Sequence, residues 1–287
     1  MNNELLRPIS TEEINIYHRN GVVPLRGMFD KDWIELLNKG LDLNCKSPTE
    51  RSRIWDKDDL GHTMFYDTLA WREIKEYKKF IFNSPAAQIC GQLMKSTTVN
   101  FFFDAVFVRS AGTKFETPWH QDEPYWSIEG YDACTLWMPL VPVKEKNCLS
   151  FVPGSHLFKS IFNQKNFGEL TGNPKDQVDF SKIAEQEFPD INADPERFGV
   201  VSWDMQPGDC IAFNGRTMHG GSGKLDDENN LRVFTTKWLG DDARIKFRNY
   251  GMDPDFSSLM IKKGLKSGDR PDTVSYTHLT LPTICSV

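Results

Sequence analysis

One short segment of the sequence combines residue types that bind metal ions. Within residues 118–126, a histidine, His120, and a carboxylate, Asp122, lie two positions apart among aromatic residues and prolines. On an extended strand, residues i and i+2 point to the same face, so these side chains are expected to converge. A third ligand is predicted at His219, after a turn and a short apolar run. Two histidines and one carboxylate on one side of a metal suit a non-haem Fe(II) centre that activates oxygen.

A His-x-Asp pair also arises by chance, so the residues downstream matter. Arg232 begins an alternating β-branched and aromatic run, residues 232–238, that is typical of a strand with one buried face. An arginine there can give a carboxylate a bidentate partner, as a keto-acid cosubstrate requires. His156 competes with His219 as third ligand, but its proline-glycine turn favours a structural role.

Taken together, these residues resemble the phytanoyl-CoA dioxygenase family of Fe(II)/2-oxoglutarate oxygenases over most of residues 10–250. Besides Arg232, the matching segments read TPWHQD at 117–122, WMPL at 137–140, FVPGSH at 151–156, PGD at 207–209 and WLGDD at 238–242. The chain departs from the family at Asn147, where glycine is usual. Asparagine tolerates a left-handed backbone, so the turn is expected to persist.

The resemblance implies a ligand set and a reaction. His120, Asp122 and His219 would hold Fe(II), leaving positions for 2-oxoglutarate and O2. The implied reaction hydroxylates a small organic substrate and releases succinate and CO2. Because Asp122 is not replaced by a small residue, no ligand position is vacated for halide, and hydroxylation is favoured over halogenation.

Further roles follow from the same resemblance. Arg232 is expected to hold the distal carboxylate of 2-oxoglutarate. Thr135 and Arg109 are candidates for a second contact or, equally, for a cross-strand hydroxyl and a surface arginine. The aromatic residues Trp119, Tyr125 and Trp126 are candidates for the substrate pocket, whose walls are typically aromatic, or for the core.

Two alternatives from other classes remain. The first is a cupin-like metal-binding protein, or a metal-dependent enzyme of other chemistry such as a zinc hydrolase, which Arg232 after the distal histidine disfavours. The second is a catalytically silent barrel, which the presence of all three ligands disfavours. Among the family's substrates, the lack of an obvious basic groove for the phosphates of coenzyme A favours a small molecule.

Composition excludes several functions. The 287 residues are 39% hydrophobic, with a net charge of −6 and a pI near 5.6. This balance argues against a nucleic-acid partner, which needs a basic face. The six cysteines form no Cys-x-x-Cys pair, as in a reducing compartment. Without a signal pattern or a membrane-length apolar run, the protein is expected to be cytoplasmic.

Helical patterns precede strand patterns along the chain. Helices are predicted near residues 10–21, 30–41, 71–80 and 84–96, and strands over residues 99–108, 134–143, 148–152, 208–214 and 231–239. Pro139 and Pro142 fit an edge or a bend better than a central position for the second strand. The polar residues 157–199 are expected to cover the mouth of a barrel. This order predicts a mainly β, cupin-like double-stranded β-helix, or jelly roll, with a helical buttress.

The chain is expected to form one domain over residues 1–273. Residues 274–287 resemble a translated sequencing adapter, and are treated as a non-native tail outside the fold.

Overall fold

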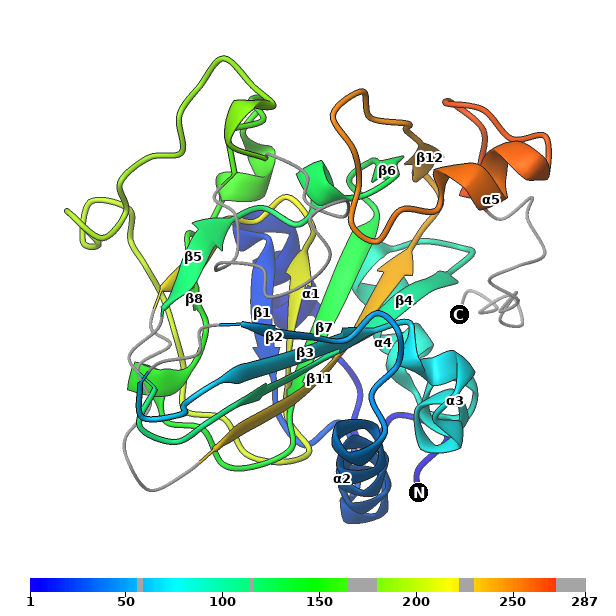
Figure 1. Ribbon diagram of the computed structural model, residues 1–287, viewed down its shortest axis with the longest axis vertical. Coiled ribbons are helices and arrows are strands. Elements are labelled where there is room, and N and C mark those ends of the chain that lie inside the picture. Colours follow the sequence, from blue (N-terminus) through cyan, green and yellow to red (C-terminus); the bar gives the residue numbers. More distant parts are fainter. Residues whose placement is uncertain (56–58, 114–115, 165–179, 222–229, 272–287) are drawn as a thin grey trace.

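The computed structural model describes residues 1–55, 59–113, 116–164, 180–221 and 230–271. Most of its strands form one large sheet: β1 (Val22–Leu25), β2 (Arg53–Trp55), β3 (Met64–Thr68), β4 (Asn100–Arg109), β7 (Ala133–Pro139), β9 (Cys210–Asn214) and β11 (Leu231–Leu239). Neighbouring strands are antiparallel, in the order β1-β9-β7-β11-β4-β3-β2 (Figure 1).

A smaller sheet faces the large one. It contains β5 (Thr117–His120), β10 (His219–Gly221) and β8 (Ser150–Phe151), in that order. Phe151 of β8 packs with Trp137, Phe213 and Val233 from the large sheet, so an apolar core lies between the two. The strands β6 (Ile128–Glu129) and β12 (Arg244–Ile245) form a separate pair. The predicted mainly β jelly roll is confirmed, and within the described residues the two sheets share no strand.

The helices begin where local signals place them. Ser10 and Glu13 form a capping box at α1 (Thr11–Asn20), which ends at Gly21 with φ of 73°. Asp30 caps α2 (Lys31–Lys46). A helix N-terminus leaves backbone N–H groups without partners, and these side-chain oxygens accept from them. Three further helices are α3 (Lys75–Asn83), α4 (Ala86–Met94) and α5 (Ser257–Lys262).

The helices cover the outer face of the large sheet. Phe234 and Trp238 of β11 point to this side, where Phe234 packs on Tyr77 of α3 at 4.7 Å between ring centroids. Figure 1 shows α2, α3 and α4 on the side of the sheet away from β5 and β8. Because successive residues of a strand alternate in direction, the inner face of β11 is left to Leu231, Val233, Thr235 and Lys237. The predicted helical buttress is therefore confirmed.

One prediction about the strands was wrong. β7 lies between β11 and β9 in the middle of the sheet, although its prolines were expected to fit an edge or a bend better than a central strand. Pro139 is tolerated because it is the last residue of the strand, where a missing N–H costs little. Of the predicted cover, residues 165–179 lie outside the described residues, as do residues 272–287, which include the adapter-like tail. No described helix is both long and apolar enough to cross a membrane.

Candidate metal centre

Two strands of the small sheet bring the candidate ligands together. His120 ends β5, His219 begins β10, and the two residues are direct cross-strand partners. The Nε2 atoms of His120 and His219 each lie 3.6 Å from Oδ1 of Asp122. One ligand atom from each residue falls within 4.8 Å of the other two. Both histidines are buried, at 6% and 3% exposure, so a metal ion here would be largely shielded from water.

Asp122 reaches this point by a different route from the one expected. β5 stops at His120, and Asp122 has helical dihedrals (φ −74°, ψ −42°) where a 3-10 turn begins. Thus the chain folds back after His120, and strand alternation does not align the two side chains. Thr135 of β7 steadies the carboxylate, because its Oγ1 donates a hydrogen bond to Oδ2 of Asp122 at 3.2 Å.

Each histidine is oriented by a hydrogen bond to a carbonyl two residues earlier. Nδ1 of His120 lies 2.8 Å from the oxygen of Pro118, and Nδ1 of His219 lies 2.9 Å from the oxygen of Thr217. A carbonyl only accepts, so each Nδ1 carries the hydrogen. The Nε2 lone pairs are therefore available for a metal ion.

The electrostatics suit a divalent cation. Burial opposes ionisation of Asp122, but the neighbouring imidazoles outweigh it and lower the pKa of this carboxyl to about 2. Burial, and then the charge of His120, lower the pKa of His219 to about 3. At neutral pH the carboxylate is ionised and His219 is neutral, which is the state in which each binds a metal ion.

A cavity beside the three ligands encloses about 730 Å³ of empty space, which includes space open to solvent. Its apolar wall includes Met64, Phe107, Trp137, Leu149, Phe213, Leu231 and Val233. Its polar wall includes Arg109, Thr117, Thr135, Asn147 and Lys237. A mostly apolar cavity with a few convergent polar groups is typical of small-molecule sites.

Arg232 lies on the wrong face of β11 for the predicted carboxylate contact. Its Nε donates to Oδ1 of Asn38 at 2.9 Å, and its Nη2 pairs with Oδ1 of Asp42 at 2.7 Å. Both partners belong to α2, on the helical side of the sheet. Because strand neighbours point in opposite directions, the cavity is lined instead by Leu231 and Val233.

Arg109, predicted as a second contact to 2-oxoglutarate, does face the cavity. It ends β4 directly opposite Leu231, is 3% exposed, and lines the cavity. Its Nη2 lies 3.1 Å from Oγ1 of Thr117, three residues before His120 on β5. The other predicted second contact, Thr135, bonds to Asp122, as described above, so it acts on the ligand set.

The three candidate aromatic residues lie in different parts of the structure. Tyr125 lies near the metal centre, with its ring 6.0 Å from that of His120 and 4.4 Å from that of Phe180. Trp119 packs in a core cluster and donates its indole hydrogen to Asn192 at 2.8 Å. Trp126 belongs to a second aromatic core cluster. None of the three is among the described residues that line the cavity.

His156 is structural, as favoured from its turn. Its Nε2 contacts the backbone oxygen of His18 at 3.1 Å, and it is not part of the cluster of ligand atoms. Two cavity residues, Thr117 and Lys237, were not singled out from the sequence. The signal for Lys237 was available, because it shares the parity of Val233 and Thr235 in an alternating run.

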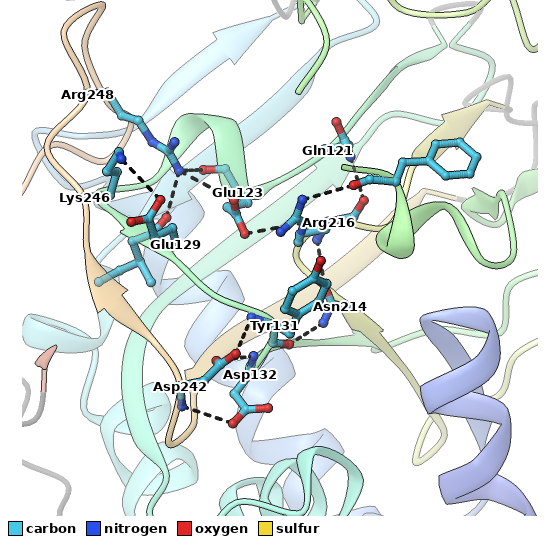
Figure 2. Close-up of polar contacts among 12 residues, drawn as sticks. Gln121, Glu123, Glu129, Tyr131, Asp132, Asn214, Arg216, Asp242, Lys246 and Arg248 are labelled. Atoms are coloured by element: carbon cyan, nitrogen blue, oxygen red, sulfur yellow. Dashed lines mark hydrogen bonds and ion pairs between the residues drawn. The ribbon is translucent and has the colours of Figure 1, made fainter. Parts of the chain in front are cut away.

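A buried polar network supports the ligand segment from behind (Figure 2). Gln121 donates to the backbone oxygen of Arg216 at 2.9 Å, and the backbone N–H of Glu123 donates to Gly215 at 2.8 Å. The carboxylate of Glu123 lies 3.9 Å from Arg216 and 3.8 Å from Arg248. These contacts join the residues flanking Asp122 to the turn that leads into His219.

Comparison with known proteins agrees with this geometry. The sequence model of one family, described as Phytanoyl-CoA dioxygenase (PhyH), matches residues 17–225. No curated protein matches the chain.

Several solved structures share the fold at low identity. The non-heme alpha ketoglutarate dependent carbocyclase SnoK from nogalamycin biosynthesis is 17% identical, over 94% of this chain and 96% of that one, with a TM-score of 0.68. EctD from S. alaskensis with 2-oxoglutarate and 5-hydroxyectoine is 17% identical over 88% and 82%, with a TM-score of 0.64. The epimerase SnoN with Fe3+, alpha ketoglutarate and nogalamycin RO is 20% identical over 90% and 93%, with a TM-score of 0.60.

Proposed function

The chain belongs to the phytanoyl-CoA dioxygenase family of non-haem iron and 2-oxoglutarate oxygenases, and we propose that it hydroxylates a small organic substrate, releasing succinate and CO2. The observation that carries the proposal is the convergence of two imidazole nitrogens and one carboxylate beside a cavity.

We assign the metal to His120, Asp122 and His219. Their donor set is the two-histidine, one-carboxylate arrangement that suits Fe(II), and the protonation states of Asp122 and His219 fit it. When bound, the iron supplies the oxygen chemistry together with 2-oxoglutarate and O2. The protein's part is to orient these groups. The carbonyls of Pro118 and Thr217 fix the imidazole rings, and Thr135 fixes the carboxylate.

Arg109 and Thr117 are assigned to the distal carboxylate of 2-oxoglutarate. Thr117 and His120 lie at opposite ends of the same short strand, and both line the cavity. The guanidinium and hydroxyl already lie side by side in the cavity. Arginine suits this role because its planar fork can donate two hydrogen bonds to one carboxylate.

The retained Asp122 favours hydroxylation. Three protein ligands on one side of the iron leave no protein-vacated position for a halide. The cavity has a mostly apolar wall with a few convergent polar groups, which supports a small substrate. The relatives whose structures are named as a carbocyclase and an epimerase show that the fold alone does not fix the outcome at the substrate.

The test is a pair of arginine variants. Arg109→Ala should weaken 2-oxoglutarate binding by on the order of 2 kcal/mol, about thirtyfold in Kd, because a charge-assisted contact is lost. Arg232→Ala is the matched control, since this arginine faces α2, and it should leave the Kd unchanged. Both are measured by calorimetric titration of the anaerobic Fe(II) protein with 2-oxoglutarate.

The reverse result, a loss of 2-oxoglutarate affinity in Arg232→Ala and none in Arg109→Ala, would remove Arg109 from the site. Titration with Fe(II) alone tests the metal assignment separately, because neither arginine contacts the ligand atoms.

A further inference from the structure

The cavity contains a buried lysine that the proposed reaction does not use. Lys237 of β11 is 6% exposed and points to the inner face with Thr235. Its Nζ donates a hydrogen bond to Oγ1 of Thr235 and lies 5.0 Å from the ring centroid of Phe103. Among the described residues, no carboxylate oxygen lies within 4.0 Å of this ammonium group.

A buried ammonium without a carboxylate is unusual, because taking a charge out of water costs several kcal/mol unless it is paired. Burial lowers the pKa of Lys237 to about 8, against the opposing effects of Asp122 and Asp104. Neither acid is its dedicated partner. Asp122 belongs to the metal, and Asp104 accepts from the backbone N–H of Trp71 on the helical side.

The ammonium group of Lys237 has more N–H donors than its hydrogen bond to Thr235 uses. A lysine carries three N–H groups, and one is used on Thr235. The hydroxyl of Thr235 is itself committed, because it donates to the backbone oxygen of Ala105 at 3.0 Å. Two N–H groups of Lys237 therefore remain for a ligand in the cavity.

Lys237 lies at the opposite end of the cavity from Arg109. Arg109 is paired across the sheet with Leu231, six residues from Lys237 on β11, or about 20 Å along the strand. The cross-strand partner of Lys237 on β7 is Thr135, which bonds to Asp122. If 2-oxoglutarate extends from the metal towards Arg109, then Lys237 lies on the opposite side of the metal, where the cosubstrate does not reach.

Charge counting points the same way. Of the charged groups that line the cavity, Arg109 and Lys237 would bring, with divalent iron, four positive charges, while Asp122 and dianionic 2-oxoglutarate would bring three negative ones; Asp104 does not line the cavity. One positive charge is left, which a single anionic group would neutralise. Phe103 lies beside the ammonium group, and Trp137 and Phe213 line the cavity, so the surroundings of Lys237 include aromatic rings.

We propose that Lys237 binds a carboxylate of the primary substrate, so that this enzyme acts on small monocarboxylic acids with an apolar body. The inference rests on the proposed function, because it takes the Arg109 end of the cavity to be filled by 2-oxoglutarate. It makes Lys237 a specificity-determining residue that does not anchor the cosubstrate.

The probes are straight-chain acids from butanoate to decanoate and 3-phenylpropanoate, each paired with its primary amide. Binding to the anaerobic Fe(II) and 2-oxoglutarate protein is measured by calorimetry. At least one acid should bind about tenfold more tightly than its amide, since the amide lacks the charge. In Lys237→Met, which keeps the length of the side chain, that preference should fall to about onefold. Lys237→Arg should retain most of it.

Three results would overturn the inference. One is that no acid binds better than its amide; another is that Lys237→Met keeps the preference. The third is that Lys237→Met weakens 2-oxoglutarate binding as strongly as Arg109→Ala, which would make the lysine a cosubstrate anchor. These outcomes are separable from failure of the proposed function, which would appear earlier, as absent binding of Fe(II) or 2-oxoglutarate to the unmodified protein.

Discussion

At the scale of single residues, the same local hydrogen bond orients both histidine rings. Each ring donates its Nδ1 hydrogen to the carbonyl two positions earlier, from Pro118 to His120 and from Thr217 to His219. No partner from a distant element is needed to select the tautomer. The ring orientation is therefore built into β5 and β10 themselves, and only the carboxylate depends on the tertiary fold.

Replacing any of the three ligands should abolish tight iron binding. His120→Ala, Asp122→Ala and His219→Ala each remove one of three protein bonds to Fe(II), so both iron binding and succinate release should be lost. His18→Ala, at an exposed site on α1, is the control and should behave as the parent protein. Anaerobic equilibrium dialysis followed by metal analysis measures binding. Parent-like iron affinity in any of the three would exclude that residue from the ligand set.

Residue types could be predicted from the sequence, but the faces of β11 could not. The types and order of His120, Asp122 and His219 were sufficient to find the metal centre. Arg232 was misplaced because a shift of one residue moves a side chain to the other face of a sheet. That parity is set by pairing with β4 and β7, more than 90 residues away in sequence, about which local pattern carries no information.

At the scale of elements, the close approach of β5 and β10 depends on a glycine. Gly220 has φ of 155°, and a Cβ at this position would lie 2.7 Å from both the oxygen of Pro118 and the Cα of Trp119. These are backbone atoms of the partner strand, so they cannot move aside independently. The pairing that sets His120 against His219 thus requires the absence of a side chain between them.

Gly220→Ala should therefore separate the two strands. The clash and the strained backbone together should cost about 2–4 kcal/mol of unfolding free energy, and iron affinity should fall as the histidines part. Gly264→Ala is the matched control. It also has positive φ, 80°, but its Cβ would meet nothing within 4 Å, so it should cost only about 1 kcal/mol and leave iron affinity unchanged. Chemical denaturation and iron titration measure the two effects, and equal iron affinities would refute this account.

At the scale of the whole molecule, the large sheet separates two different environments. Its outer face carries the helical layer, and its inner face carries the cavity and the metal centre. The order of patterns, helices first and strands later, was enough to predict this division. The strand order was not predictable, because β11 pairs with β4 and β7 through hydrogen bonds that any strand backbone can make.

Substitutions at neighbouring residues of β11 should affect the outer and the inner face of the sheet separately. Phe234→Ala should cost about 3–5 kcal/mol of stability, since this fully buried ring packs on Tyr77 and Phe80. Its effect on the Kd of 2-oxoglutarate should be small. Val233→Ala should cost only about 1–2 kcal/mol but enlarge the cavity and weaken that binding. Thermal unfolding and calorimetry give both quantities, and a swapped pattern would show that the faces are misassigned.

The pairing of His120 with His219 also bears on how long the protein survives in a cell. An ion held by both residues cross-links positions about 100 residues apart, and so restricts the unfolded chain much as a disulfide does. Iron that binds only the folded state stabilises it by mass action. Cells short of iron should then carry more of the opened chain, which proteases degrade. Enzyme abundance is expected to follow iron supply even when synthesis is constant.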